Sequence, residues 1–289
     1  MMVEQRALRF GCQACWLIGI LSVPQQPLAR GVLIVTGGPQ YRVGSHRQFT
    51  LLACHLAGQG IPVLRFDYRG MGDSEGAVRT FETIDDDLHC AVQEFFKSVP
   101  QLQEVVIWGL CDGATAAAFY AGRDSPGRDS PGRDNRVCGL ILLNPWVRTE
   151  QGAARTTLRH YYAARLQDRN FWRKLVHGAV SPRTVLASLR QLMGAAMPAT
   201  RGEYAPAQLP ARIFASLSRF NGHILLILSG EDLGAREFSD LQKSSAAWQR
   251  LSSEPRLQQV EVPGANHTFS RREWREQVAQ LCVAWLTSW

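Results

Sequence analysis

A cysteine lies between two glycines in the stretch Gly109-Leu110-Cys111-Asp112-Gly113. An apolar run at 105–108 precedes it and alanines follow it, so a strand leading directly into a helix is expected. A nucleophile on such a sharp turn leaves no room for bulky side chains two positions before and after it, and glycines meet that demand. The helix start would favour a thiolate and stabilise an oxyanion. Cys111 is therefore a candidate nucleophile, and a buried structural cysteine is the competing interpretation.

Such a nucleophile needs an acid and a histidine base, in the chain order nucleophile, acid, histidine. Asp232 follows the apolar run 224–228 through a glycine turn, and His267 follows a second apolar run, 259–262. Both would lie at the carboxyl ends of parallel strands, where such a sheet presents residues to ligands. Of the seven histidines only His267 has such a position. Glu231 and Asp240 are weaker candidates for the acid.

The oxyanion of an acyl-transfer intermediate needs two N–H donors. The N–H of Asp112, directly after the nucleophile, would supply one. Gly38, in the loop after the apolar run 32–35, would supply the other, because Pro39 has no N–H. The Asp112 carboxylate would oppose thiolate formation at Cys111 unless its side chain points away.

The elements that must position these residues alternate along the chain. Apolar strand-like segments are expected at 8–23, 32–35, 62–66, 105–108, 137–143, 224–228 and 259–262. Helical stripes begin near Phe49, with Ser45 as N-cap, near Ile84, at Ala114 and at Trp274. The three aspartates at 85–87 are interpreted as a solvated helix start rather than a metal site. From residue 32 on, this pattern predicts an α/β fold with a mostly parallel sheet and helices on both faces.

Two segments interrupt the alternation. Residues 122–134 repeat Gly-Arg-Asp-Ser-Pro twice and begin it again, which predicts a flexible surface loop. Residues 145–220 are helix-like and too long for a loop inside a compact domain. They predict a helical lid inserted into a core formed by 1–144 and 221–289.

The positive charge gathers in that predicted lid. The chain has a formal net charge of +7, but 145–220 alone holds 11 Arg and one Lys against three acidic residues. No nucleic-acid-binding motif accompanies it, so no nucleic-acid partner is expected. The lid is either helical sequence with a solvated basic face and aromatic residues packed beneath it, or an electropositive cover that attracts an anionic substrate or a membrane surface.

The apolar run near the N-terminus and the cysteines bear on the compartment and on possible cofactors. The apolar run after Cys15 has about nine residues, whereas a membrane span needs roughly 20. Without a recognisable signal peptide, the seven scattered cysteines indicate reduced thiols in the cytoplasm. Cys12 and Cys15 lack the further ligands of a zinc site and are interpreted as strand residues. No metal or cofactor is expected.

Together these features resemble an α/β-hydrolase over nearly the full length. The stretch Asp67-Tyr68-Arg69-Gly70-Met71-Gly72-Asp73-Ser74 resembles that family's structural D-x-R-G-x-G-x-S loop, and the family's pattern favours Asp232 as the acid. More closely, the segments TGGPQYR (36–42), GLCD (109–112) and LNPWVRTE (143–150) resemble exosortase A system-associated hydrolases of type 1. That group is associated with bacterial exopolysaccharide export, and its name supplies no substrate.

The resemblance implies hydrolysis of an ester, thioester or lactone through an acyl-cysteine. Cysteine in place of serine is a change shared with dienelactone hydrolases. Two rivals stay open: an acyltransferase on the same scaffold, and a non-catalytic binding partner. The acyl group, the acceptor and the oligomeric state do not follow from the sequence.

Overall fold

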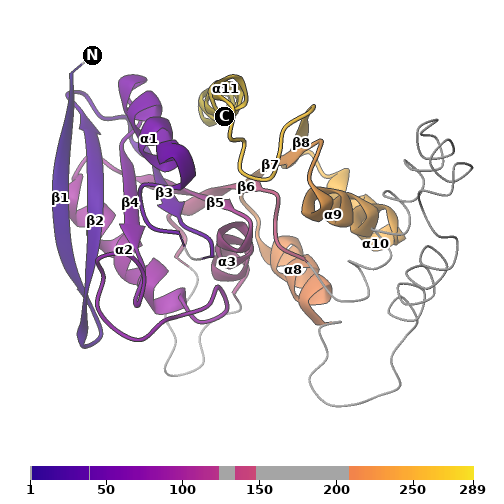
Figure 1. Cartoon of the computed structure of the whole chain (residues 1–289), viewed down its shortest axis with the longest axis horizontal. Helices are drawn as coiled ribbons and strands as arrows, with labels where there is room; N and C mark the ends of the chain where they lie inside the picture. The colour runs from indigo at the N-terminus through magenta and orange to yellow at the C-terminus, as the bar shows by residue number, and fades with distance from the viewer. Residues whose placement is uncertain (1, 39, 124–133, 148–207) are drawn as a thin grey trace, which may run out of the picture.

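A computed structural model describes residues 2–38, 40–123, 134–147 and 208–289 of the chain. Its centre is one sheet with the strand order β1-β2-β4-β3-β5-β6-β7-β8 (Figure 1). The strands are β1 (Val3–Cys12), β2 (Cys15–Pro24), β3 (Arg30–Val35), β4 (Val63–Asp67), β5 (Glu104–Leu110), β6 (Val137–Leu143), β7 (His223–Ser229) and β8 (Leu257–Val262).

The strands from β4 to β8 in this order are parallel, and β1 and β2 extend one edge in antiparallel fashion. The central strands β3, β4, β5 and β7 are buried along almost their whole length. Strands covered on both faces are expected to be nearly continuous apolar runs, as these are. The predicted mostly parallel sheet is confirmed.

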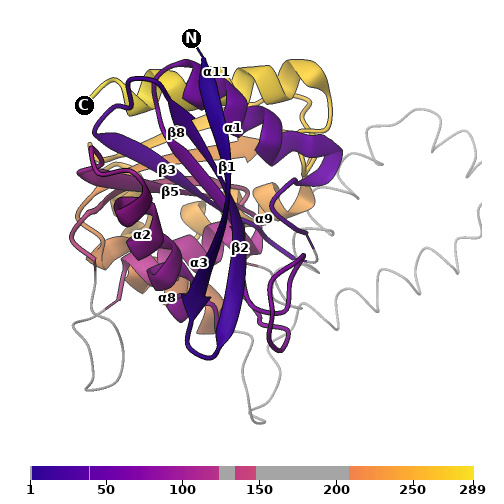
Figure 2. The same ribbon diagram turned by 90° about the vertical axis from the view of Figure 1, so that its left-hand side faces the viewer.

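Helices cover both faces of the sheet (Figures 1 and 2). One face carries α1 (Gln48–Gly58) and α11 (Arg272–Leu286), whose apolar stripes pack on β3, β5, β6 and β7. The opposite face carries α2 (Asp85–Ser98), α3 (Asp112–Ala121), α8 (Gln208–Arg219), α9 (Leu233–Lys243) and α10 (Ala246–Ser252). The two hydrophobic clusters thus hold the sheet, and with it the carboxyl ends of its strands, in a fixed arrangement.

The apolar segment 8–23 differs from the prediction because it is not one strand. It folds back as a hairpin in which Cys12 pairs with Cys15 across a two-residue turn. Gln13 takes a positive φ of 54° in that turn, a conformation typical of tight hairpin connections. Both thiols are free, so the Cys-x-x-Cys consists of strand residues, as expected.

The helices differ from the prediction in where α1 begins and in the presence of two further helices. Ser45 does not cap α1, because Ser45–Arg47 form a 3-10 turn and the helix begins at Gln48 after a left-handed Arg47. The helices α9 and α10 have no counterpart in the prediction. Their sequences carry short apolar stripes interrupted by polar residues, and their caps are the side chains of Asp232 and Ser245.

The predicted solvated start of α2 is wrong for one of its three aspartates. Asp87 is fully buried, and its carboxylate accepts hydrogen bonds from the Arg69 guanidinium and from the Arg69 backbone N–H at 2.8 Å. Asp86, one residue earlier, is 42% exposed and lies 3.5 Å from the same guanidinium. The aspartates therefore attach the loop after β4 to the start of α2.

The two interrupting segments fall mainly outside the described residues. This applies to 124–133 of the predicted repeat loop and to 148–207 of the predicted lid. Of the remaining lid residues, α8 packs on α3 and buries Ile213 and Leu217 in the core. Within the described ranges, no helix has the length and apolar character needed to cross a membrane.

The Arg69–Asp87 pair yields a stability prediction. Asp87→Asn removes the buried countercharge of the Arg69 guanidinium and leaves it only the exposed Asp86 carboxylate, so we expect the free energy of unfolding to fall by about 3–5 kcal/mol. Asp86→Asn is the matched control, and its exposed carboxylate predicts a loss below about 1 kcal/mol. Urea unfolding of both variants measures the difference. Equal losses would contradict the assignment of Asp87 as the anchor.

Candidate active site

The turn between β5 and α3 holds Cys111 in a strained backbone conformation. Cys111 has φ 60° and ψ −124°, and α3 starts at the next residue. A non-glycine residue with positive φ persists only where its surroundings enforce it. Here the Cys111 N–H donates to the Leu143 carbonyl at 2.9 Å, and the Cys111 carbonyl accepts from Ala114 at 3.1 Å. The strand-to-helix turn expected from the sequence is therefore present, with the partly exposed thiol at its apex.

The flanking glycines are required by close backbone contacts. A Cβ at Gly109 would lie 2.4 Å from the Gly113 carbonyl oxygen, and a Cβ at Gly113 would lie 2.8 Å from the Val35 carbonyl oxygen. Both distances are shorter than side chains tolerate, and the opposing atoms are backbone that cannot rotate away. The steric demand inferred from the sequence spacing is thus met by β5, α3 and the neighbouring β3.

The predicted acid and base lie together at the carboxyl ends of β7 and β8. His267 Nδ1 is 3.1 Å from Asp232 Oδ2. Asp232 is also the N-cap of α9, and its carboxylate accepts the Ala235 N–H at 2.8 Å. The alternative acid Glu231 is 66% exposed on its side chain and lies 3.5 Å from Arg236. Asp240, the other alternative, belongs to α9.

Electrostatics link the acid, the base and the cysteine. The hydrogen bond with Asp232, followed by one with Cys111, raises the pKa of His267 to about 10. Burial, the largest effect, raises the pKa of Asp232, but the hydrogen bond with His267, the charge of His267 and the backbone N–H groups at the start of α9 together lower the net pKa below its usual value. The raised pKa favours the imidazolium form of His267 at neutral pH. A cation beside a cysteine favours its thiolate form.

Asn144 supports the loop of the predicted base, a role that its sequence motif does not indicate. It directly follows β6, is buried, and has a left-handed φ of 44°. Its side-chain N–H donates to the His267 carbonyl at 2.9 Å, and its side-chain oxygen accepts the Ser229 N–H at 2.9 Å. Asn144 thus connects the ends of β6 and β7 to the loop that carries the histidine. Its place in the Asn-Pro pair after a buried strand was the available signal.

Gly38 and Asp112, whose N–H groups are the two predicted oxyanion donors, are in contact with each other. The contact is made by the Asp112 side chain, which accepts the hydrogen bond of the Gly38 N–H. The Gly38 N–H donates to Asp112 Oδ2 at 2.8 Å, and the Gly113 N–H donates to Asp112 Oδ1 at 3.0 Å. The Asp112 side chain therefore turns towards the loop after β3 and bonds to one of the two predicted oxyanion donors.

The loop that resembles D-x-R-G-x-G-x-S acts as a support for this region. The buried Asp67 carboxylate accepts the Arg42 N–H at 2.6 Å and the Asp73 N–H at 3.2 Å. The Tyr68 hydroxyl donates to the Gly38 carbonyl at 3.3 Å. The loop therefore fixes the segment after β3 that contains Gly38.

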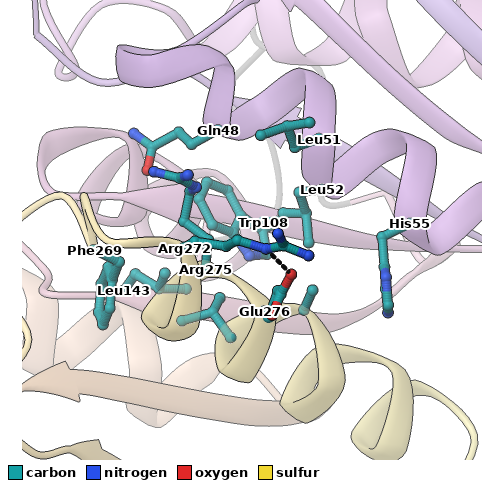
Figure 3. A pocket seen from close by; sticks show the side chains of 12 residues that line it. Gln48, Leu51, Leu52, His55, Trp108, Leu143, Phe269, Arg272, Arg275 and Glu276 are labelled. Carbon is teal, nitrogen blue, oxygen red and sulfur yellow. Dashed lines mark hydrogen bonds and ion pairs between the residues drawn. The ribbon is translucent and has the colours of Figure 1, made fainter.

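A pocket of about 350 Å³ lies between α1 and α11 (Figure 3). Leu52, Trp108 and Phe269 contribute to its apolar lining, while Arg272 and Glu276 form an ion pair of 2.6 Å at its edge. Cys111, Asp232 and His267 are not among its lining residues. Cys111 nevertheless packs against the hydrophobic cluster to which Trp108 and Phe269 belong. The pocket is therefore adjacent to the residues that support the turn and is not formed by the three predicted catalytic side chains.

In the part of the chain that the structure describes, no group of three or more His, Cys, Asp or Glu side chains could hold a metal ion.

Two arginines of the predicted lid, Arg212 and Arg219, belong to the described residues. Arg212 pairs with Glu82, and Arg219 donates to the Gly122 carbonyl at 2.9 Å.

Comparison with known proteins places this arrangement in context. The model of the alpha/beta hydrolase family matches residues 32–281. No curated protein matches the chain in sequence. Among solved structures, an esterase from Pyrococcus furiosus superposes with a TM-score of 0.64 at 14% identity, covering 99% of this chain and 91% of that one.

Two further structures are similar to the chain over nearly its full length. A dienelactone hydrolase from Anabaena variabilis has a TM-score of 0.60 at 15% identity, with 100% of this chain and 99% of that chain covered. Est1E from Butyrivibrio proteoclasticus, with ferulic acid bound, has a TM-score of 0.61 at 15% identity, with 97% and 98% covered. At these identities the likeness demonstrates the fold.

The close approach at Gly109 can be tested by adding one methyl group. Gly109→Ala forces β5 and α3 apart, so we expect a loss of about 1–3 kcal/mol or more in the free energy of unfolding. Gly58→Ala is the control, because a Cβ there has no neighbour within 4 Å and helical alanine is favoured over glycine. Thermal and urea unfolding compare the two. A Gly109→Ala protein as stable as Gly58→Ala would refute the steric argument.

The raised pKa of His267 predicts a pH-dependent stability. Folding raises this pKa, so the stabilisation is complete below about pH 6.5, the ordinary value for histidine, and is lost as the pH rises through about 10. Asp232→Asn removes the main cause, so its unfolding free energy should fall less steeply across that window. Urea unfolding from pH 6 to 10 measures the slopes. Glu231→Gln, which neutralises the neighbouring exposed carboxylate, should keep the wild-type slope; an unchanged slope in Asp232→Asn would contradict the coupling.

Proposed function

The chain belongs to the alpha/beta hydrolase family, and from this we propose that it hydrolyses an ester, thioester or lactone through an acyl intermediate on Cys111. The observation that carries the proposal is the chain of contacts from Asp232 through His267 to Cys111 at the strained turn. A nucleophile, a base within hydrogen-bond reach and a group that orients the base are the parts that covalent acyl transfer requires.

The first half of the proposed reaction forms the acyl-cysteine. The Cys111 thiolate attacks the carbonyl carbon, and the carbonyl oxygen becomes the oxyanion of a tetrahedral intermediate. This intermediate collapses when the alcohol or thiol leaves with the proton of the His267 imidazolium. Asp232 keeps the imidazole oriented and stabilises its charged form. The Gly38 and Asp112 N–H groups are the donors proposed for the oxyanion.

The second half releases the acid. Neutral His267 takes a proton from water, and the resulting hydroxide attacks the thioester carbonyl. Collapse of this second intermediate breaks the carbon–sulfur bond and returns the thiolate beside the imidazolium. The products are the carboxylic acid and the alcohol or thiol, so atoms and charge balance over the cycle.

Chemistry and similarity both bear on the substrate class. A thiolate leaves a tetrahedral intermediate more readily than an alkoxide, so an acyl-cysteine forms productively from activated esters, thioesters and lactones rather than from peptides. The structural neighbours include proteins described as an esterase and a dienelactone hydrolase, which supports this range. The link to exopolysaccharide and exosortase-associated metabolism, together with a cytoplasmic location, is proposed from the sequence resemblance alone. Attraction of anionic substrates by the basic segment is a further proposal, and most of that segment lies outside the described residues.

Replacement of the nucleophile tests the proposed function. We expect Cys111→Ala to lower kcat/KM for p-nitrophenyl acetate by about 10³-fold or more, because loss of a triad nucleophile removes the covalent route. Cys54→Ala is the matched control, since Cys54 is an exposed cysteine on α1. Release of p-nitrophenol gives the rates, and circular dichroism checks the fold. Full residual activity in a folded Cys111→Ala protein would exclude Cys111 as the nucleophile.

The same assay separates hydrolysis from acyl transfer. Addition of glycerol as a hydroxyl acceptor should leave acetate as the product of a hydrolase. Formation of acetylglycerol in proportion to glycerol, detected by mass spectrometry, would instead identify an acyltransferase. No acyl adduct on Cys111 with any activated ester or thioester would favour a binding protein.

A further inference from the structure

The Asp112 carboxylate is held where the proposed reaction places its oxyanion. One oxygen accepts the Gly38 N–H at 2.8 Å and the other accepts the Gly113 N–H at 3.0 Å. One of the two proposed oxyanion donors, the Gly38 N–H, thus already serves an acceptor supplied by the protein.

The surrounding backbone is shaped to receive this side chain. A Cβ at Gly37 would lie 2.2 Å from Asp112 Oδ1, so any other residue at 37 would collide with the carboxylate. Gly38 has a φ of 56°, and its carbonyl accepts the hydrogen bond from Tyr68 that fixes the orientation of its peptide. The space for the carboxylate therefore results from two glycines and a buried tyrosine on elements outside α3.

Backbone N–H groups partly offset the cost of burying this carboxylate. Burial, the largest effect, leaves the pKa of Asp112 above its usual value, and the hydrogen bonds from Gly38 and Gly113 act in the opposite direction. The positive charge of His267 also favours the ionised form. Charge-assisted hydrogen bonds of this type are stronger than those between neutral groups. A neutral carbonyl oxygen of a substrate is a weaker acceptor than the carboxylate that it must replace.

We propose that Asp112 is a specificity-determining residue whose carboxylate is the resting occupant of the oxyanion site, so that only substrates whose other contacts offset its displacement are acylated. This inference rests on the proposed function. It predicts discrimination against small activated esters, which bring little binding energy of their own. It also predicts that the acid product is displaced from the site by the returning Asp112 carboxylate.

Two reagents that modify Cys111 distinguish occupation of the oxyanion site by Asp112 from an effect of Asp112 on the reactivity of the Cys111 thiolate. Iodoacetamide alkylates the thiolate by displacing iodide and forms no oxyanion. p-Nitrophenyl acetate acylates the same sulfur through a tetrahedral oxyanion. The ratio of acylation to alkylation at Cys111, measured by peptide mass spectrometry and the p-nitrophenol burst, therefore reports access to the oxyanion donors and cancels changes in thiolate reactivity.

Asp112→Ala should raise this ratio about tenfold or more, because an acceptor with charge-assisted hydrogen bonds is removed from the site. Asp112→Asn, which keeps the shape but presents an N–H group to the amides, should raise it as well and serves if the alanine variant does not fold. Glu261→Gln, an exposed carboxylate on β8, is the control and should leave the ratio unchanged. The gain should be larger for p-nitrophenyl acetate than for p-nitrophenyl decanoate.

Added acetate provides the second readout. It should inhibit acylation of Asp112→Ala, whose amides are open to an external carboxylate, and leave the wild-type protein unaffected. Parallel changes in acylation and alkylation, or a lower ratio, would overturn the role of Asp112 while leaving Cys111 as the nucleophile. Alkylation without acylation in the wild-type protein and in every variant would instead overturn the proposed function. Acylation that appears only in the Asp112 variants would support the inference strongly.

Discussion

Backbone must approach backbone within a few ångströms where β5 turns into α3, and the rest of the site depends on this constraint. The turn succeeds because Gly109 and Gly113 have no side chains and because Cys111 accepts a positive φ. The strain of such a residue, of order 1–3 kcal/mol, has to be offset elsewhere. The buried strands beside it and the small-residue helix α3 supply that offset through packing on both faces of the sheet.

Two carboxylates and a histidine surround the Cys111 thiol. The Asp232 carboxylate lies beside His267, which hydrogen-bonds with Cys111, and the Asp112 carboxylate accepts the Gly38 N–H of the loop after β3. Each charge has its own support: Asp232 caps α9, Asn144 holds the His267 loop, and backbone N–H groups hold Asp112. Asn144 also links β6 to β7, so the spacing between acid and base is set by the sheet rather than by flexible loops.

The sequence predicted the positions of strands and of the turn at Cys111 more reliably than the directions of side chains. The apolar runs located β3 to β8, and the Gly-x-Cys-x-Gly spacing located the turn, because both patterns arise from local sterics. The hairpin of β1 and β2 was missed because its two-residue turn carries no glycine, asparagine or proline signal. The short helices α9 and α10 were missed because polar residues interrupt their stripes.

Tertiary contacts explain the remaining differences. The burial of Asp87 depends on Arg69, which is distant in sequence, and an acidic helix start resembles any solvated one. The direction of the Asp112 side chain depends likewise on the Gly37–Gly38 loop, 74 residues away. Spacing alone identified Gly38 and Asp112 as neighbours of the same site, but it could not show that the side chain of one would bond to the backbone of the other.

The 2.2 Å separation between Asp112 Oδ1 and a Cβ built at Gly37 also bears on how this chain can evolve. The same Cβ would lie 2.5 Å from the Leu110 carbonyl oxygen and 2.9 Å from the Gly113 nitrogen, which are backbone atoms that remain whichever residue stands at 112. Position 37 is therefore expected to stay glycine among descendants of this sequence as long as the turn after β5 is kept. Position 112 is free to lose its carboxylate, so the filling of this space can change in evolution while the loop around it cannot.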